Sequence, residues 1–169
     1  MSPSPTLPEP SPADATESPD ALRPSTPQAS QLRCCSLLDI FGTPELEAFA
    51  GFLDVIHWPA GATVIEEGEL GTAMFILLEG EARLERHRLE LRPLVPGDVF
   101  GELGLITGRP RAATITAHTP LVLARLTRSR YDALIAQAPS VAVAFLQALV
   151  GRVGHGLVAM TDSMGILLT

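Results

Sequence analysis

The sequence of 169 residues contains no lysine: all twelve of its basic residues are arginine, and nineteen acidic residues give a formal net charge of −7. Nucleic-acid-binding domains normally present a basic face, so this acidic balance disfavours a nucleic-acid partner. The glycine-containing segment FGELGLITG at residues 100–108 also lacks the lysine and the Ser or Thr of a Walker loop. It therefore does not predict nucleotide hydrolysis with magnesium.

Long apolar runs and well-spaced cysteines are also missing. No stretch approaches the ~18–20 apolar residues of a membrane span, and the N-terminus has neither the positive region nor the apolar core of a signal peptide. The only cysteines, Cys34 and Cys35, are adjacent, and such neighbours rarely form a disulfide because the short ring is strained. We therefore expect a cytoplasmic protein in a reducing compartment, with either two ordinary thiols or a lipidation or redox-sensing pair.

Catalytic and metal-binding patterns are not found. The four histidines are scattered without the spacing of metal ligands, which argues against zinc. Neither Ser36 nor Ser129 lies in a nucleophile elbow or another catalytic signature. We predict that the protein is not an enzyme and holds no metal or cofactor.

The first 35 residues are rich in Pro, Ser, Thr and acids and contain few large apolar side chains. Such a segment buries too little surface to offset the entropy of ordering, so we expect a disordered leader at residues 1–35. The remaining residues, 36–169, are expected to form one domain, because an apolar content of 46% is ample for one core.

The most informative segment is FGELGLITGRPRAAT, residues 100–114. Gly101 and Gly104 allow backbone amides to approach an anion closely, and residues 102–107 can form a short helix with unpaired N–H groups at its start. Arg111 or Arg109 can pair with phosphate oxygens, and Glu102 can accept hydrogen bonds from sugar hydroxyls. The alternative is a surface salt bridge and tight-turn glycines.

This segment resembles the phosphate-binding cassette of cyclic nucleotide-binding domains, as in the sensor domain of Crp/Fnr-type regulators and in regulatory subunits of cAMP-dependent protein kinase. The resemblance implies that Glu102 takes the ribose 2′-hydroxyl and that Arg111 pairs with the cyclic phosphate, while Arg109 faces solvent. The family commonly places a residue other than glycine at position 104, so Gly104 puts the affinity in doubt. The full set of ligand-binding residues implied by the resemblance is Gly101, Glu102, Leu103, Gly104, Arg111, Ala112, Leu84 and Arg86.

The same resemblance implies a mainly β fold: a double-stranded β-helix, or jelly-roll-like β-roll, at about residues 55–127, with an N-terminal helix and C-terminal helices at about 128–165. Glycines punctuate short β-rich runs between residues 59 and 84, where tight turns need positive φ. Alternating residues from Ala82 to Leu91 predict a hairpin with one buried face. Its turn at His87 and Arg88 lacks Gly or Asn, which leaves the register open. Residues 121–126 predict the last buried strand, after one at 112–117.

Helices are predicted on both sides of the roll. Thr43 and Pro44 predict an N-cap and first turn before an amphipathic helix, and Ser129 with Asp132 predicts a capped helix through residue 137. Pro139 can begin a final helix. The apolar positions that these helices should bury are Leu46, Phe49, Ala50, Leu53, Val141, Phe145, Leu146, Leu149 and Val153.

Gly154 and Gly156 predict a break in the final helix. The apolar tail that follows could pack on its own domain, close over the nucleotide base or contact a second copy.

The predicted function is a cyclic nucleotide sensor whose ligand shifts the position of the C-terminal helices. Family members that prefer cGMP often carry Thr or Ser after the cassette arginine, so Ala112 favours cAMP over cGMP. The expected partners are the cyclic nucleotide and either a protein effector or a second copy in a homodimer. The alternatives are a nucleotide-free interaction domain, or the sensor half of a DNA-binding regulator, since no helix-turn-helix follows in the sequence.

Overall fold

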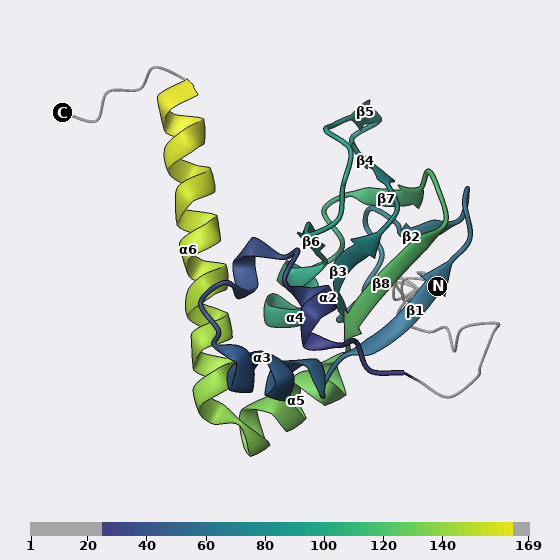
Figure 1. Cartoon of the computed structure of the whole chain (residues 1–169). Helices are drawn as coiled ribbons and strands as arrows, with labels where there is room; N and C mark the ends of the chain where they lie inside the picture. The colour runs from purple at the N-terminus through teal and green to yellow at the C-terminus, as the bar shows by residue number, and fades with distance from the viewer. Residues whose placement is uncertain (1–24, 164–169) are drawn as a thin grey trace, which may run out of the picture.

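The computed structural model describes the backbone of residues 25–163 and the side chains of residues 25–152. Within this part of the chain, helices lie before, within and after a set of antiparallel strands (Figure 1). The helical elements are α2 (Ala29–Leu32), the 3-10 helix η1 (Ser36–Leu38), α3 (Thr43–Ala50), α4 (Glu102–Thr107), α5 (Arg128–Gln137) and α6 (Pro139–Ser163). The strands are β1 (Asp54–Trp58), β2 (Thr63–Ile65), β3 (Met74–Glu79), β4 (Ala82–Arg86), β5 (Leu89–Glu90), β6 (Val99–Phe100), β7 (Thr114–Ala117) and β8 (Leu121–Leu126).

The strands form two four-stranded sheets, in the orders β1-β8-β3-β6 and β2-β7-β4-β5. All pairings are antiparallel, and most join segments far apart in the sequence. This is the β-roll with flanking helices that the sequence predicted. Strand β8 has the predicted bounds, whereas β7 begins at Thr114, two residues later than predicted.

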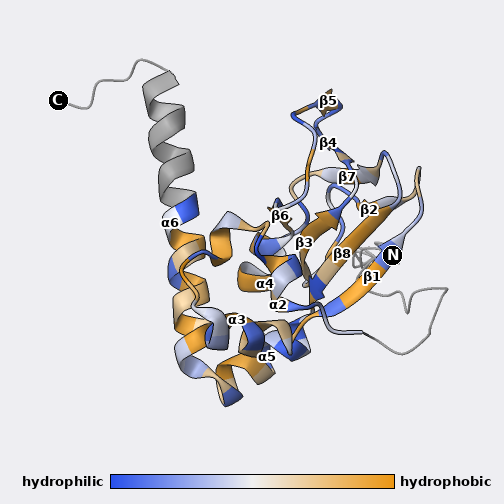
Figure 2. Cartoon of the chain, viewed as in Figure 1, coloured by the Kyte–Doolittle hydropathy of each residue, from blue (hydrophilic) through white to orange (hydrophobic). Residues whose placement is uncertain are grey.

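Strand β3 is buried on both faces, which explains why its sequence MFILLE does not alternate. Phe75 and Leu77 point into a core enclosed by the roll, where Phe75 stacks on Phe100 of β6 with ring centroids 5.2 Å apart. Met74 and Ile76, on the other face, belong to a second core shared with the helices. Figure 2 shows the mainly apolar colouring of β3 and β8.

The second core lies under α2, α3, α5 and α6, which gather on one side of the roll (Figure 1). Phe49 of α3 packs on Phe145 of α6 with centroids 5.1 Å apart. Leu32 of α2 and the neighbouring Cys35 are fully buried in this core. The folded region therefore includes residues that we assigned to the leader, and its start is corrected from residue 36 to within residues 25–35. The strongly apolar QLRCCSLL run carries this signal, which the composition of the leader as a whole obscured.

The two cysteines differ in environment. Cys34 is exposed, whereas Cys35 is buried and free, and burial, only partly offset by backbone hydrogen bonds, raises the pKa of its thiol to about 11. A buried thiol that keeps its proton serves as a packing group.

Helix starts differ from the predicted ones by one or two residues. Gly42 is the N-cap of α3, so Thr43 is already helical, with Pro44 in the first turn. For α5 the N-cap is Thr127, whose hydroxyl accepts a hydrogen bond from the backbone N–H of Arg130 at 3.3 Å. In both cases the predicted N-cap lies inside the helix, and a residue that can serve as N-cap lies just before the helix.

The final helix α6 begins at Pro139, as predicted, and runs without interruption to Ser163. The predicted break at Gly154 and Gly156 is therefore wrong: the helix continues through both glycines, although each costs roughly 1 kcal/mol relative to alanine. The side chain of Val153 and the tail after residue 163 lie outside the described residues. No helix among residues 25–163 is long and apolar enough to cross a membrane.

The β4–β5 hairpin corrects a second prediction. Leu89 and Leu91, expected on a buried face, are 69% and 46% exposed, because β5 is the edge strand of its sheet and nothing covers it among the described residues. The two-residue turn at His87 and Arg88 has φ of 50° and 63°, and Arg86 pairs with Leu89. Both turn residues are therefore left-handed, the conformation in which Asn-Gly is preferred.

Replacing Arg88 with glycine is expected to raise the free energy of unfolding by about 1 kcal/mol, because glycine removes the steric cost of the left-handed conformation. Urea denaturation measures the change. Arg86→Gly is the matched control, since this residue sits in β4, where glycine should destabilise. Equal effects of the two substitutions would show that the turn is not strained.

Candidate functional site

The site begins at Arg111, whose guanidinium lies behind the short helix α4. The side chain is only 4% exposed. Its Nη1 donates to the carbonyl of Gly101 at 3.1 Å and its Nη2 donates to the carbonyl of Ala73 at 3.0 Å. These bonds place a buried positive charge directly beside the N-terminal turn of α4, where the helix already carries partial positive charge.

Two glycines make this close approach feasible. A Cβ on Gly101 would lie 2.7 Å from the Ala73 carbonyl and 2.8 Å from Nη1 of Arg111, and its φ is +80°. A Cβ on Gly104 would lie 2.8 Å from the same Nη1 and would collide with the carbonyl oxygen of Gly71. Glycine at position 104 is thus required by packing in this chain.

The backbone of Arg111 is held by the loop that follows β2. Its N–H donates to the carbonyl of Glu69, and its carbonyl accepts from the N–H of Gly68, both at 2.8 Å. Two main-chain bonds and two side-chain bonds therefore fix the arginine before any ligand arrives, which limits the entropy lost on binding.

Glu102 is the first residue of α4 and is half-buried. Within the part of the chain whose side chains are described, its carboxylate makes no hydrogen bond or ion pair with another residue. A carboxylate with two acceptor oxygens therefore belongs to the first turn of α4.

The other predicted ligand-binding residues are spread around this turn. Leu103 is 52% exposed and Ala112 is exposed. Leu84 of β4 is half-buried and is paired with Ile115 of β7, four residues after Arg111. Arg86 is exposed at the end of β4. The register with β7 runs from Leu84 opposite Ile115 to Glu85 opposite Thr114, so β4 approaches the cassette in the direction of Arg86.

Arg109 is exposed, as predicted. It lies two residues from the buried Arg111 in the same loop, so the structure distinguishes the two arginines that the residue types alone left equivalent.

Sequence reasoning missed two groups of contacts. The carbonyl of Ala73 accepts a hydrogen bond from the guanidinium and that of Gly71 packs against Gly104, but a backbone carbonyl leaves no mark in the sequence. It also missed Arg128 of α5, whose Nη1 donates to the carbonyl of Leu105 in α4 at 3.0 Å. The signal for Arg128 was weak: it is an arginine two residues after the last strand, with no periodicity to distinguish it.

The β-roll carries a buried arginine, a short helix with glycine on both sides and a half-buried carboxylate. This is the arrangement that the resemblance to cyclic nucleotide-binding domains implied. Comparison with known proteins supports this. The Cyclic nucleotide-binding domain family model matches residues 55–138. The regulatory subunit of cAMP-dependent protein kinase from Aspergillus fumigatus is 41% identical over 93 residues, which are 54% of this chain and 22% of that subunit.

Two solved structures extend the likeness. A cyclic nucleotide-binding domain from Methylobacillus flagellatus has a TM-score of 0.71 at 18% identity, covering 83% of this chain and 86% of that one, which bears on the fold alone. A protein solved in work on a cyclic-GMP-dependent signalling pathway that regulates bacterial phytopathogenesis is 34% identical, with a TM-score of 0.61, covering 68% of this chain and 95% of that one.

The chain belongs to the cyclic nucleotide-binding domain family, as its cassette predicted. The curated relatives that it matches are regulatory subunits rather than catalytic ones, and the chain spans less than a quarter of their length, 22% and 23% of the first two.

Proposed function

We propose that this domain is a cAMP sensor in which Arg111 neutralises the cyclic phosphate. The observation that carries the proposal is the buried guanidinium of Arg111, held at 3.1 Å and 3.0 Å by the carbonyls of Gly101 and Ala73. A guanidinium matches two phosphate oxygens, and its charge acts most strongly where water is excluded. The N–H groups of Leu103 and Gly104 in the first turn of α4 add donors to the same anion.

Glu102 would bind the sugar in this proposal. Its half-buried carboxylate accepts hydrogen bonds and donates none when ionised, so it suits a ribose hydroxyl and would repel a phosphate placed directly against it. The ligand is thereby oriented, with phosphate toward Arg111 and sugar toward Glu102.

The base preference rests on Ala112. Its methyl group offers no hydroxyl to guanine, which favours cAMP, and the fungal relatives are named as subunits of cAMP-dependent kinases. Leu84 and Arg86 on β4 are the proposed wall for the base.

In this proposal, α4 would transmit the effect of ligand binding to the C-terminal helices α5 and α6. Leu105 is fully buried in the same core as Phe145 and Leu149 of α6, and its carbonyl accepts the hydrogen bond from Arg128 of α5. Any shift of α4 on closing over the ligand therefore acts on both C-terminal helices. Ligand changes this equilibrium only by its differential affinity for the two arrangements. The receiver would be another polypeptide.

Calorimetric titration with cAMP and with cGMP tests the proposal. We expect saturable binding of cAMP and weaker binding of cGMP. In Ala112→Thr the added hydroxyl should move the preference toward cGMP by about fivefold to tenfold, the value of one hydrogen bond. Ala112→Val has the same shape without the hydroxyl and should leave the preference unchanged.

Absence of heat with both nucleotides at high micromolar concentration would refute the sensor and favour a nucleotide-free interaction domain. An equal shift in the threonine and valine variants would refute the account of base selection while leaving the sensor in place.

A further inference from the structure

A second candidate site lies where α6 meets the roll. A cavity of about 600 Å³ opens between η1, the loop that joins β5 to β6, and α6. None of its lining residues belongs to the cassette. Its volume is that of ordinary small-molecule sites, about 300–1,000 Å³.

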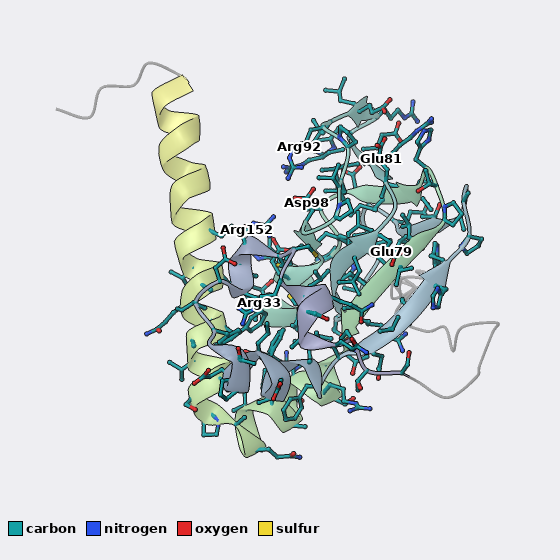
Figure 3. The ribbon with its side chains drawn as sticks, viewed as in Figure 1. Arg33, Glu79, Glu81, Arg92, Asp98 and Arg152 are labelled. Carbon is teal, nitrogen blue, oxygen red and sulfur yellow. The ribbon has the colours of Figure 1, made fainter. Side chains whose placement is uncertain are left out.

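Positive charge predominates at this cavity, although the chain as a whole is acidic. Arg92 and Arg152 line it, with Asp98 as the acidic residue among the lining side chains. The guanidinium of Arg92 donates two hydrogen bonds to the carboxylate of Asp98, at 2.9 Å and 3.2 Å. Nη2 of Arg152 donates to the carbonyl of Val99 at 3.3 Å. Figure 3 shows Arg152 on the side of α6 that faces Arg92 and Asp98.

The carboxylate of Asp98 is already committed. Burial acts to raise its pKa, but hydrogen bonds from Arg92 and from the N–H of Val95, with the charges of Arg92 and Arg152, outweigh burial and lower the pKa. Asp98 therefore remains ionised, and two guanidinium charges face one carboxylate charge.

Part of the cavity lining is apolar. Leu37 of η1, Ile40 shortly after η1 and Ala148 of α6 contribute it, and Ile40 is 55% exposed. The combination of a cationic end and an aliphatic wall suits a ligand with a charged head and an apolar body.

Gly151 supplies an independent observation. It lies in the middle of α6 and lines the cavity, yet a Cβ built on it would meet nothing within 4 Å. Glycine is less favourable than alanine in a helix interior, and internal packing does not require it here, unlike at Gly104. The missing side chain leaves the space beside Arg152 open.

We propose that this cavity is a second ligand site, which binds a small aliphatic carboxylate with its head at Arg92 and Arg152 and its chain along Leu37 and Ile40. The site unites the helix α6 with the roll, so its occupant would contact both.

Octanoate is the probe, and the intact chain is titrated by calorimetry and by chemical-shift perturbation. Acetate supplies the head alone, and octylammonium supplies the same chain with the opposite charge. We expect saturable binding of octanoate at one site, at least tenfold tighter than binding of either control.

Two variants assign the site. Arg152→Gln should weaken octanoate at least about tenfold, because a charge-assisted hydrogen bond is lost, whereas Arg83→Gln, an exposed charge change on β4, should change it less than twofold. Gly151→Leu should abolish binding by filling the cavity while raising the midpoint of thermal unfolding. Val150→Leu, on the neighbouring 72% exposed position, should leave binding unchanged.

The proposal is overturned if octanoate binds no better than acetate or octylammonium. It is equally overturned if both Arg152→Gln and Gly151→Leu bind octanoate with wild-type affinity. Because the cavity and the cassette share no residue, either result leaves the cAMP proposal standing.

Discussion

Replacing Arg111 with alanine is expected to weaken cAMP binding at least about 100-fold, as measured by calorimetry. Each charge-assisted hydrogen bond to the phosphate contributes roughly 1.5–3 kcal/mol, and a planar guanidinium provides two, so the loss reaches about 3 kcal/mol or more. The expected loss is larger than for any surface arginine because Arg111 is only 4% exposed and water cannot replace it cheaply.

The same substitution also acts on the fold. The carbonyls of Gly101 and Ala73 lose their guanidinium donor, and a buried acceptor left unpaired costs about 1–3 kcal/mol. The free energy of unfolding should therefore fall by about 2–4 kcal/mol. Arg111→Lys keeps the charge but not the fork, so it should recover only part of the affinity.

Arg109→Ala is the matched control for Arg111→Ala. Arg109 carries the same charge two residues away but is exposed, so its loss should change affinity less than twofold and leave stability unchanged within about 0.5 kcal/mol. If Arg109→Ala lowers the affinity for cAMP as much as Arg111→Ala does, then the summed positive charge of the loop attracts the phosphate. The buried guanidinium would then make no specific contribution to binding.

Features whose signals lie within one short segment could be predicted from the sequence, whereas contacts between distant segments could not. The helix α4 has the predicted bounds of residues 102–107 because its signals, glycine at each end and an apolar run between, all lie within the segment. The partners of Arg111 could not be predicted, because Ala73 lies 38 residues earlier and contributes a main-chain carbonyl. The residue type shows which interactions a side chain can make, but it does not show which backbone groups will be its partners in the fold.

The hairpin shows a different limit. Alternation placed Leu84 and Leu89 on one face, and Leu84 is half-buried as that requires, but Leu89 is 69% exposed. Period-2 alternation identifies which side chains share a face, whereas burial of that face depends on whether another element covers it. The same distinction explains α2: Leu32 is buried because α2 packs against α3 in the helical core, although the composition of the leader as a whole predicted disorder.

Replacing Gly104 with alanine is expected to lower the free energy of unfolding by about 2 kcal/mol and to weaken cAMP at least about tenfold. Alanine is the better helix former by about 1 kcal/mol, so propensity alone predicts the opposite sign. The structure predicts destabilisation because the new Cβ meets the main-chain carbonyl of Gly71, which cannot swing away as a side chain would. Displacing Nη1 of Arg111, 2.8 Å from the same Cβ, accounts for the loss of affinity.

Alanine substitutions at two other glycines distinguish the cost of a steric collision from the cost of an unfavourable backbone conformation. Gly108 ends α4 with φ +66° and open space around it, so Gly108→Ala should cost about 1 kcal/mol from conformation alone and spare cAMP binding. Gly151 is helical with open space, so Gly151→Ala should stabilise by up to about 1 kcal/mol. Chemical denaturation should therefore rank the proteins Gly151→Ala, wild type, Gly108→Ala and Gly104→Ala, from most to least stable. If Gly104→Ala instead ranks with Gly151→Ala, the Gly71 loop yields to a methyl group, and the fixed placement of Arg111 on which the site depends is wrong.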